Sequence, residues 1–310
     1  MKPIIVFGSI NMDLVTKTPR LPAAGETITG YNFFTAGGGK GANQAVAAAR
    51  LGIPTQIVGC VGGDEFGRQL LADLQTAGVQ TDGVLVDETT SSGVAVITVD
   101  DAGENNIIII AGANGRLNKT DVERLGDRLP GAAALLMQLE IPMPVVQLAA
   151  QAAHSAGVPV ILDPAPAQTI PAELYPLVDI ITPNQLEASQ LVGFPVDGEE
   201  AAAQASAVLR QRGVGSAIVK LGDRGVLCAT AEETFFVPAF SVQAVDTVAA
   251  GDAFNGALAV ALAQGRPLRE AVVWGAASGA LSAMKAGAQP SLPDRKTFEA
   301  FLRERGLGAN

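Results

Sequence analysis

Short apolar runs alternate with helical periods along most of this 310-residue chain. Each run is rich in Val, Ile, Leu and Ala, as expected of a strand that is covered on both faces. The runs lie at 4–10, 55–60, 132–139, 158–162, 178–182 and 217–221. The helical periods lie between them, at 41–51, 65–77, 144–156, 185–192 and 199–212. This alternation predicts an α/β fold with a doubly wound, mainly parallel sheet and helices on both faces.

Three strand-like segments break this rhythm, at 13–18, 27–35 and 93–110. No helical period separates the pieces of any one segment, and residues 101–104 predict a hairpin turn inside the last one. The three segments therefore predict a small β-sheet that is separate from the main one.

Composition restricts the partners of the protein. Hydrophobic residues make up 48% of the chain, so a substantial core is available, and the formal net charge is −10. A charge of this sign argues against nucleic-acid or anionic-membrane partners. A phosphate ligand must therefore be held by local devices such as a helix N-terminus, a metal ion or single cations.

Other features of the sequence predict a soluble, cytoplasmic protein. The longest apolar region, 257–284, is interrupted by a Gly-Arg-Pro turn, which argues against a membrane span. The N-terminal apolar run indicates a first strand and not a signal peptide. Cys60 and Cys228 lie in apolar segments far apart in the sequence and indicate buried thiols, not a disulfide framework or a metal site.

The stretch 246–256 reads D-T-V-A-A-G-D-A-F-N-G and leads into a helix-forming run. Its small residues let backbone N–H groups approach a ligand, and the first N–H groups of a helix favour an anion. Asp252 is placed to accept a proton from an attacking hydroxyl, and an ordinary pKa of about 3.9 would leave it ionised at pH 7. The alternative is an aspartate that only complements the helix dipole.

A second glycine loop, A-G-G-G-K-G-A-N at 36–43, also opens a helix. Consecutive glycines cost conformational entropy, so the loop indicates close approach of a ligand, although a simple turn is the alternative. Gly37, Gly39 and Ala42 also fit a relaxed dinucleotide fingerprint, with Asp64 about 20 residues further on, as in a nicotinamide-dependent oxidoreductase. Against this alternative, the glycines do not follow the first strand of a simple βαβ unit, and the Gly-Asp stretch is left unexplained.

Polar residues also stand on one strand face, at a strand end and on one helix face. Asn11 and Asp13 alternate along a strand and therefore face the same way. Glu140 ends an apolar strand, at the edge where open α/β sheets bind ligands, although a solvated surface charge would look the same. Asn184 and Glu187, at i and i+3, suit a largely hydrated magnesium ion. The alternative for this pair is a capping box at a helix start.

These stretches resemble the signatures of the ribokinase-like carbohydrate kinases, the PfkB family. G-G-K-G-A-N-Q-A at 38–45 matches the N-terminal signature, and the stretch 246–256 matches the C-terminal one. Further matches at 8–13, 137–140, 182–187 and 285–291 extend the resemblance over essentially the whole chain. One departure is visible, because Ala249 stands where the family has the first glycine of G-A-G-D. We expect little consequence, since the later N–H donors are unaffected.

The resemblance implies ATP-dependent phosphorylation of the 5-hydroxyl of ribose, with 2-deoxyribose or a nucleoside as alternative acceptors. It implies one kinase domain over 1–310, in which about 12–36 and 92–110 form a lid over the sugar, and a homodimer made by paired lids. A non-catalytic sugar sensor on the same fold is a third possibility. The intact Asp252, Asn184 and Glu187 argue against it.

The resemblance also implies a role for individual residues. The base is Asp252, and the anion hole comprises Ala249, Ala250, Gly251 and Asp252. The sugar contacts are Asn11, Asp13, Gly38, Gly39, Lys40, Asn43, Glu140 and Asp252. The ATP contacts are Asn184, Lys220, Gly222, Gly225, Gly251 and Ala276. Magnesium is bound by Glu187 through water, and a monovalent cation such as potassium is bound by Asp246, Val248, Ser282, Lys285, Gly287 and Ser291.

Overall fold

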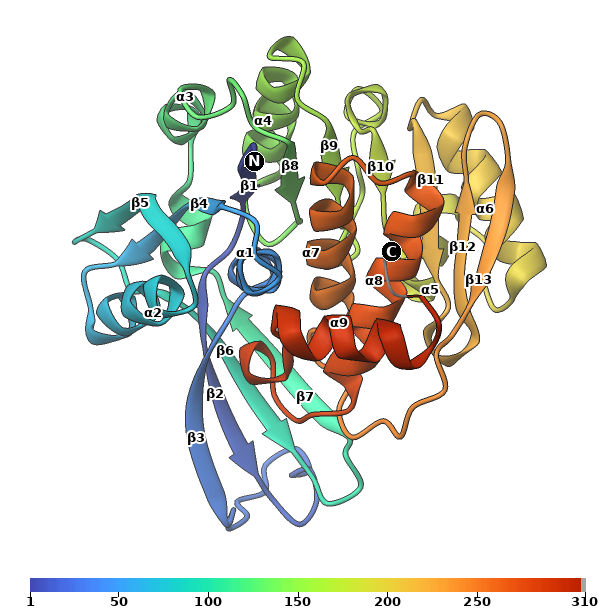
Figure 1. The fold of residues 1–310 in the computed structure, drawn as a ribbon. Coiled ribbons are helices and arrows are strands. Elements are labelled where there is room, and N and C mark those ends of the chain that lie inside the picture. Colours follow the sequence, from blue (N-terminus) through green and yellow to red (C-terminus); the bar gives the residue numbers. More distant parts are fainter. Residues whose placement is uncertain (308–310) are drawn as a thin grey trace.

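The computed structural model describes residues 1–307, and its centre is a nine-stranded sheet (Figure 1). The strands are β1 (Ile4–Phe7), β4 (Thr55–Gly62), β5 (Val79–Asp87), β8 (Ala134–Met137), β9 (Val160–Leu162), β10 (Ile180–Ile181), β11 (Ser216–Lys220), β12 (Gly225–Ala229) and β13 (Thr234–Pro238). Their order is β13-β12-β11-β10-β9-β8-β1-β4-β5. Neighbours from β11 to β5 are parallel, and the β11–β12 and β12–β13 pairs are antiparallel.

Helices cover both faces of this sheet (Figure 1). One face carries α1 (Lys40–Arg50), α2 (Glu65–Thr76), α7 (Ala250–Ala263), α8 (Leu268–Ala283) and α9 (Arg295–Glu304). The other carries α3 (Lys119–Gly126), α4 (Met143–Ser155), α5 (Gln185–Val192) and α6 (Glu199–Gln211). Ile4 and Val6 of β1 point into the first core, and Ile5 and Phe7 point into the second. Within residues 1–307, no helix has the length and apolarity to cross a membrane.

A second, four-stranded sheet, called the small sheet below, extends away from the main one (Figure 1). Its strands are β2 (Asn11–Lys17), β3 (Asn32–Gly38), β6 (Gly93–Val99) and β7 (Asn105–Ile110), in the order β3-β2-β6-β7. Asp13, Ala95 and Ile109 are in register across three strands, so their side chains share one face. Every residue of β7 is exposed, including four consecutive isoleucines. The small sheet therefore presents apolar surface to solvent.

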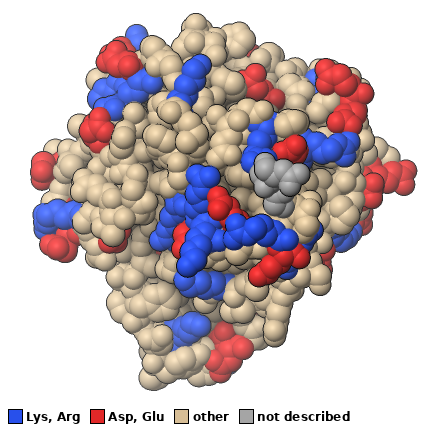
Figure 2. Space-filling model, viewed as in Figure 1, with Lys and Arg blue, Asp and Glu red and all other residues tan. Residues whose placement is uncertain are grey.

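Charge is distributed unevenly over the surface. Figure 2 shows basic side chains gathered over α9, which carries Arg295, Lys296 and Arg303, in the middle of the face in view. The net charge of −10 is thus carried mainly elsewhere.

The predicted α/β architecture and the separate small sheet are confirmed. The helix predicted at 185–192 is α5, whereas the other predicted helices and strands begin or end one or more residues away. The antiparallel hairpin β12–β13 was not predicted. The segment predicted at 27–35 is shifted, because β3 continues to Gly38 in register with Asn11.

Candidate active site

Five neighbouring parallel strands of the main sheet lead into polar side chains at one edge. Ser9 follows β1, Glu140 follows β8, Asp163 follows β9, Asn184 follows β10 and Lys220 ends β11. Because β4 lies on one side of β1 and β8 on the other, a topological switch point separates β1 from β8. Ser9 Oγ donates a 2.5 Å hydrogen bond to Glu140 Oε2 across it. Open α/β sheets bind their ligands in such a crevice.

Glycines bring Asp13 and the start of α1 to this edge. A Cβ at Gly38 would collide with the Asp13 carboxylate, so glycine is needed there. Gly39 has a φ of 86°, which favours glycine, and turns the chain from β3 into α1. The Lys40 N–H then donates to Glu140 Oε2 at 3.1 Å. Five of the predicted sugar contacts thus meet around this loop: Asp13, Gly38, Gly39, Lys40 and Glu140.

The N-terminus of α7 opens toward the same edge. Ala249, just before it, has a φ of 60° and is the one non-glycine residue of 1–307 with a positive φ. The Ala250 N–H donates to Thr247 O at 3.2 Å. Among the described residues, no acceptor is found for the N–H groups of Gly251 and Asp252. These two donors and the helix dipole together favour an anion.

Asp252 is the third residue of α7 and lies against α1. Glycine at position 256 of α7 lets the two helices approach closely, since a Cβ there would collide with Ala47 of α1. Asn43 Nδ2 donates to Asp252 Oδ2 at 2.9 Å, and Gln44 Nε2 donates to Asp252 Oδ1 at 3.1 Å. Both carboxylate oxygens are therefore held by amide donors of α1.

Two buried carboxyl groups have pKa values near neutrality. Burial raises the pKa of Asp252 to about 6, against the Lys40 charge and the two amide donors. The ordinary pKa predicted from the sequence is therefore wrong, because the sequence did not show that the group is buried. Burial, together with the charges of Glu140 and Asp252, raises the pKa of Asp13 to about 7. Carboxyl groups with such values suit proton transfer at neutral pH.

Two lysines balance these carboxylates. Burial lowers the pKa of Lys40, but the charges of Asp252 and Asp163 help to raise it above its usual value, so the ammonium stays protonated. Lys220 Nζ lies 3.0 Å from Asp163 Oδ1. It also lies 3.3 Å from the position of a Cβ built on Gly251. Lys220 therefore adds positive charge beside the free N–H groups of α7.

These features identify the protein. Residues 1–295 match the family described as pfkB family carbohydrate kinase. The chain belongs to this family. The kinase is 41% identical over 301 residues to ribokinase of Haemophilus influenzae, covering 97% of this chain and 98% of that one. It is 36% identical to deoxyribokinase of Salmonella typhi, covering 96% and 98%. The solved structure of Arabidopsis thaliana ribokinase complexed with ribose and ATP has a TM-score of 0.90 at 38% identity, covering 97% and 99%.

The alternative of a nicotinamide-dependent oxidoreductase is wrong. Gly37 lies in β3 of the small sheet and not in the turn of a βαβ unit. Asp64 caps α2 through the Gly67 N–H, and it also accepts hydrogen bonds from the Ser92 N–H and Oγ. The acidic residue of the relaxed dinucleotide fingerprint thus serves a structural purpose.

Asn184 and Glu187 form a capping box at the start of α5. Asn184 Oδ1 accepts the Glu187 N–H at 2.8 Å, and Glu187 Oε2 accepts the Asn184 N–H at 2.7 Å. Glu187 Oε1 accepts Asn184 Nδ2 at 2.9 Å, and burial raises the pKa of Glu187. Within 1–307, no three His, Cys, Asp or Glu residues gather as a metal site. The capping alternative is confirmed, and a hydrated magnesium ion beside Glu187 stays a prediction.

The predicted cation and nucleotide positions fall into separate groups. Asp246 accepts the Val248 and Gly287 N–H groups at 3.0 and 2.9 Å, and Ser282 Oγ lies 2.7 Å from Ser291 Oγ. Lys285 follows α8 and is exposed.

Among the predicted nucleotide positions, Gly222 has open space where a Cβ would lie. A Cβ at Gly225 would collide with the backbone of β13, so packing alone explains why this residue is a glycine. Ala276 is half-buried on α8, one turn before Gly279, whose Cα approaches Ala250 O.

Sequence reasoning missed several residues of the polar cluster. Asp163 follows the apolar run 158–162, so the strand-end rule that selected Glu140 would also have selected it. Gln44 stands inside the N-terminal signature, next to Asn43. Asn114 donates to Asn11 Oδ1 at 2.7 Å, and no pattern in the sequence indicated this contact.

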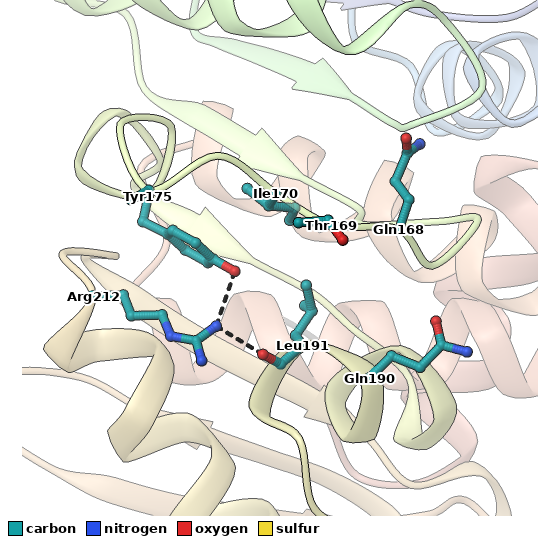
Figure 3. A pocket seen from close by; sticks show the side chains of 8 residues that line it. Gln168, Thr169, Ile170, Tyr175, Gln190, Leu191 and Arg212 are labelled. Atoms are coloured by element: carbon teal, nitrogen blue, oxygen red, sulfur yellow. Dashed lines mark hydrogen bonds between the residues drawn. The ribbon is translucent and has the colours of Figure 1, made fainter.

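A pocket of about 550 Å³ is lined by residues of α5 and of the segment between β9 and β10, together with Arg212 (Figure 3). Arg212 donates to Tyr175 Oη and to the Leu191 carbonyl on one side of it, and the Gln168 and Gln190 side chains lie further along (Figure 3). None of the predicted site residues lines this pocket. The pocket is therefore not formed by the polar cluster at the strand ends and the start of α7.

Proposed function

We propose that this kinase transfers the γ-phosphoryl group of ATP to the 5-hydroxyl of D-ribose, giving D-ribose 5-phosphate and ADP. The observation that carries the proposal is the buried Asp252 carboxylate, held by two amide donors next to the free N–H groups of α7. The relatives named ribokinase, and the solved ribokinase with ribose and ATP, support ribose as the acceptor.

The sugar is bound between the small sheet and α1. Asp13 and Glu140 accept hydrogen bonds from sugar hydroxyls, and the Lys40 charge balances that of Glu140. The backbone at Gly38 and Gly39 lets the sugar approach closely. The remaining contacts come from Asn11 and Asn43. Asn11 lies two residues before Asp13 on β2, and Asn43 donates to Asp252, which supports this arrangement.

Asp252 acts as the base in the reaction. It takes the proton of the 5-hydroxyl as that oxygen bonds to the γ-phosphorus, and the bond from the γ-phosphorus to the departing ADP oxygen breaks. The turn at Ala249 and Ala250 presents the Gly251 and Asp252 N–H groups to the transferring phosphoryl group. Losing one such donor typically costs about 10²–10³ in rate.

ATP is bound along the C-terminal ends of β10 and β11. Lys220 neutralises phosphate charge, Asn184, Gly222 and Gly225 border the nucleotide, and Ala276 lies near the adenine. Glu187 already accepts two hydrogen bonds from Asn184, so magnesium would be held through water and mainly by the phosphates. The carbonyl and hydroxyl oxygens around Asp246, Val248, Ser282, Lys285, Gly287 and Ser291 suit a monovalent cation such as potassium.

The assembly follows from the small sheet. We propose that residues 1–310 form one kinase domain, in which about 12–36 and 92–110 act as a lid over the sugar. The exposed isoleucines of β7 pack against the lid of a second copy in a homodimer. The proposed location of the reaction is the cytoplasm, which supplies ATP.

An ADP-release assay across a panel of acceptors tests the proposal. ADP should form from ATP on addition of ribose, and more slowly with 2-deoxyribose, fructose, adenosine or pseudouridine. A preference for 2-deoxyribose would support the activity named for the Salmonella typhi relative. Sugar binding without ADP release from any acceptor would indicate a sensor and overturn the proposal.

A further inference from the structure

Gln44 occupies the centre of the polar cluster, although no step above uses it. Its side chain is 0% exposed. Nε2 donates to Asp163 Oδ2 at 3.0 Å and to Asp252 Oδ1 at 3.1 Å. Oε1 accepts a 2.7 Å hydrogen bond from Gln138 Nε2. Each amide hydrogen therefore has its own carboxylate acceptor, and the two carboxylates, which would repel Oε1, require the Nε2 end of the amide to face them.

This arrangement connects the base to the cation beside the anion site. Asp163 connects Gln44 to Lys220, because its Oδ2 accepts a hydrogen bond from Gln44 Nε2 and its Oδ1 accepts one from Lys220 Nζ. A continuous chain of hydrogen bonds therefore runs from Asp252 through Gln44 and Asp163 to Lys220. A hydrophobic side chain at position 44 could fill the same space in the core, but it would remove one donor from each of two buried carboxylates, Asp252 Oδ1 and Asp163 Oδ2.

We propose that Gln44 is a positioning residue, which separates the Asp252 and Asp163 carboxylates, keeps Asp252 ionised and aims its free lone pairs at the acceptor hydroxyl. This inference rests on the proposed role of Asp252 as the base. Without the amide, two buried carboxylates of like charge would face each other, and sharing one proton would become favourable.

The charges around Asp252 come from several elements. Lys40 of α1 favours the ionised form, and Asp163, after β9, opposes it. The charges of Asp13 on β2 and Asp252 also oppose each other's ionisation. Against this background, the donors from Asn43 and Gln44 are the two hydrogen bonds that favour ionised Asp252. Removing the Gln44 donor should therefore raise the pKa of Asp252.

The test compares three substitutions by their pH profiles for ADP release with ribose. Gln44→Met keeps the length of the side chain and removes both N–H donors. The acid limb of the kcat profile, the pH range in which kcat falls as Asp252 is protonated, should therefore shift to higher pH by about one to two units. The corresponding loss in kcat is about two- to tenfold at pH 7, with recovery near pH 9 and a ribose KM within about threefold. Gln44→Glu adds a third carboxyl group and should move the limb further. Gln138→Met, an equally buried substitution next to it, leaves both carboxylate hydrogen bonds in place and should leave the limb where it is.

A second measurement does not depend on turnover. A group whose pKa is raised in the folded state costs stability as pH rises from its unfolded value through its folded value. In urea unfolding, the loss of stability caused by Asp252 should end near pH 6 in the wild type and extend to higher pH in Gln44→Met. Adding Asp252→Asn to Gln44→Met should remove the extension.

The outcomes separate this inference from the proposed function. Coincident acid limbs and coincident stability profiles for Gln44→Met and wild type would overturn the positioning role. A wild type that releases no ADP with any acceptor would overturn the proposed function, and the unfolding profiles would still decide whether Gln44 keeps Asp252 ionised.

Discussion

The Asp13 carboxylate lies directly against the Cα of Gly38, so that any side chain at position 38 would collide with it. This contact connects β2 and β3 of the small sheet to the start of α1. It also explains why burial raises the pKa of Asp13 to about 7, since the neighbouring strand excludes water.

Asp13 should make sugar binding depend on pH. Sugar hydroxyls donate to the ionised carboxylate, so the Kd for ribose should fall as pH rises through about 7. Asp13→Asn should flatten this dependence, and Asp13→Ala should weaken binding by about 10–100-fold. Calorimetric titration measures both without turnover. An unchanged Kd in Asp13→Ala would rule out the contact.

The same carboxyl group should affect the stability of the sugar-free protein. Its pKa is raised in the folded state, so stability is lost as pH rises from about 4 through about 7. The melting temperature should fall over this window, and it should fall less in Asp13→Asn.

Glu187→Gln distinguishes a capping residue from one that also orients hydrated magnesium. With a metal role, the variant should need more magnesium for activity and show a lower kcat, while ribose binding stays intact. With capping alone, it should lose about 1 kcal/mol of stability or less at an unchanged magnesium requirement. Asp121→Asn changes the equivalent residue in the capping box of α3 and serves as the matched control.

The sequence predicted a mainly parallel sheet without a strand order, and it predicted a polar residue at the end of a buried strand. Apolar runs mark buried parallel strands, and a polar residue after such a run lies at the binding edge, as Glu140 does. The rule applies equally to Asp163, which was overlooked. By contrast, the pKa of Asp252 could not be predicted, because it depends on α1 packing against α7 across more than 200 residues of sequence.

The backbone conformation at Ala249 could also not be predicted from the sequence. Ala249 departs from the family glycine, but its identity as alanine does not indicate the φ of 60° that the turn into α7 requires. The capping box of α5 illustrates the opposite limit. Asn184 and Glu187 fit both a cap and a metal site at the same spacing, so the pattern alone left two interpretations.

The small sheet should dimerise through its exposed isoleucines. Ile109 shares a face with Asp13 and is 46% exposed, so Ile109→Glu should give a monomer in sedimentation at micromolar concentration and a higher ribose KM. Val86→Glu places the same charge at a similarly exposed site on β5 and should leave the dimer intact. A fully active wild-type monomer would contradict the paired-lid assembly.

Ala249→Gly should relieve backbone strain before α7. A left-handed conformation costs a non-glycine residue about 1–2 kcal/mol, which glycine would avoid. The greater freedom of glycine in the unfolded chain offsets about 0.4–1 kcal/mol of this gain in stability. A net stabilisation of up to about 1 kcal/mol in urea unfolding is expected, with kcat within about threefold because the N–H donors remain. Ala250→Gly, at a helical position, should instead destabilise. Equal losses in the two variants would show that Ala249 is not strained.

Asp252→Asn is the most direct test of the site. The carboxamide keeps the shape of the side chain but cannot take the hydroxyl proton, so kcat should fall by about 10²–10⁴-fold. Ribose and ATP should bind nearly as before, since most of their proposed contacts lie on other residues and the carboxamide can still form a hydrogen bond with the 5-hydroxyl. One amide of α1 loses its acceptor, so only a modest change in melting temperature is expected. Asp294→Asn makes the same change at the N-cap of α9, where an amide oxygen caps nearly as well as a carboxylate, and should leave kcat unchanged with at most a small loss of stability. If Asp252→Asn retained more than about a tenth of the wild-type kcat, Asp252 would be only a complement to the helix dipole, since loss of a base costs more than that.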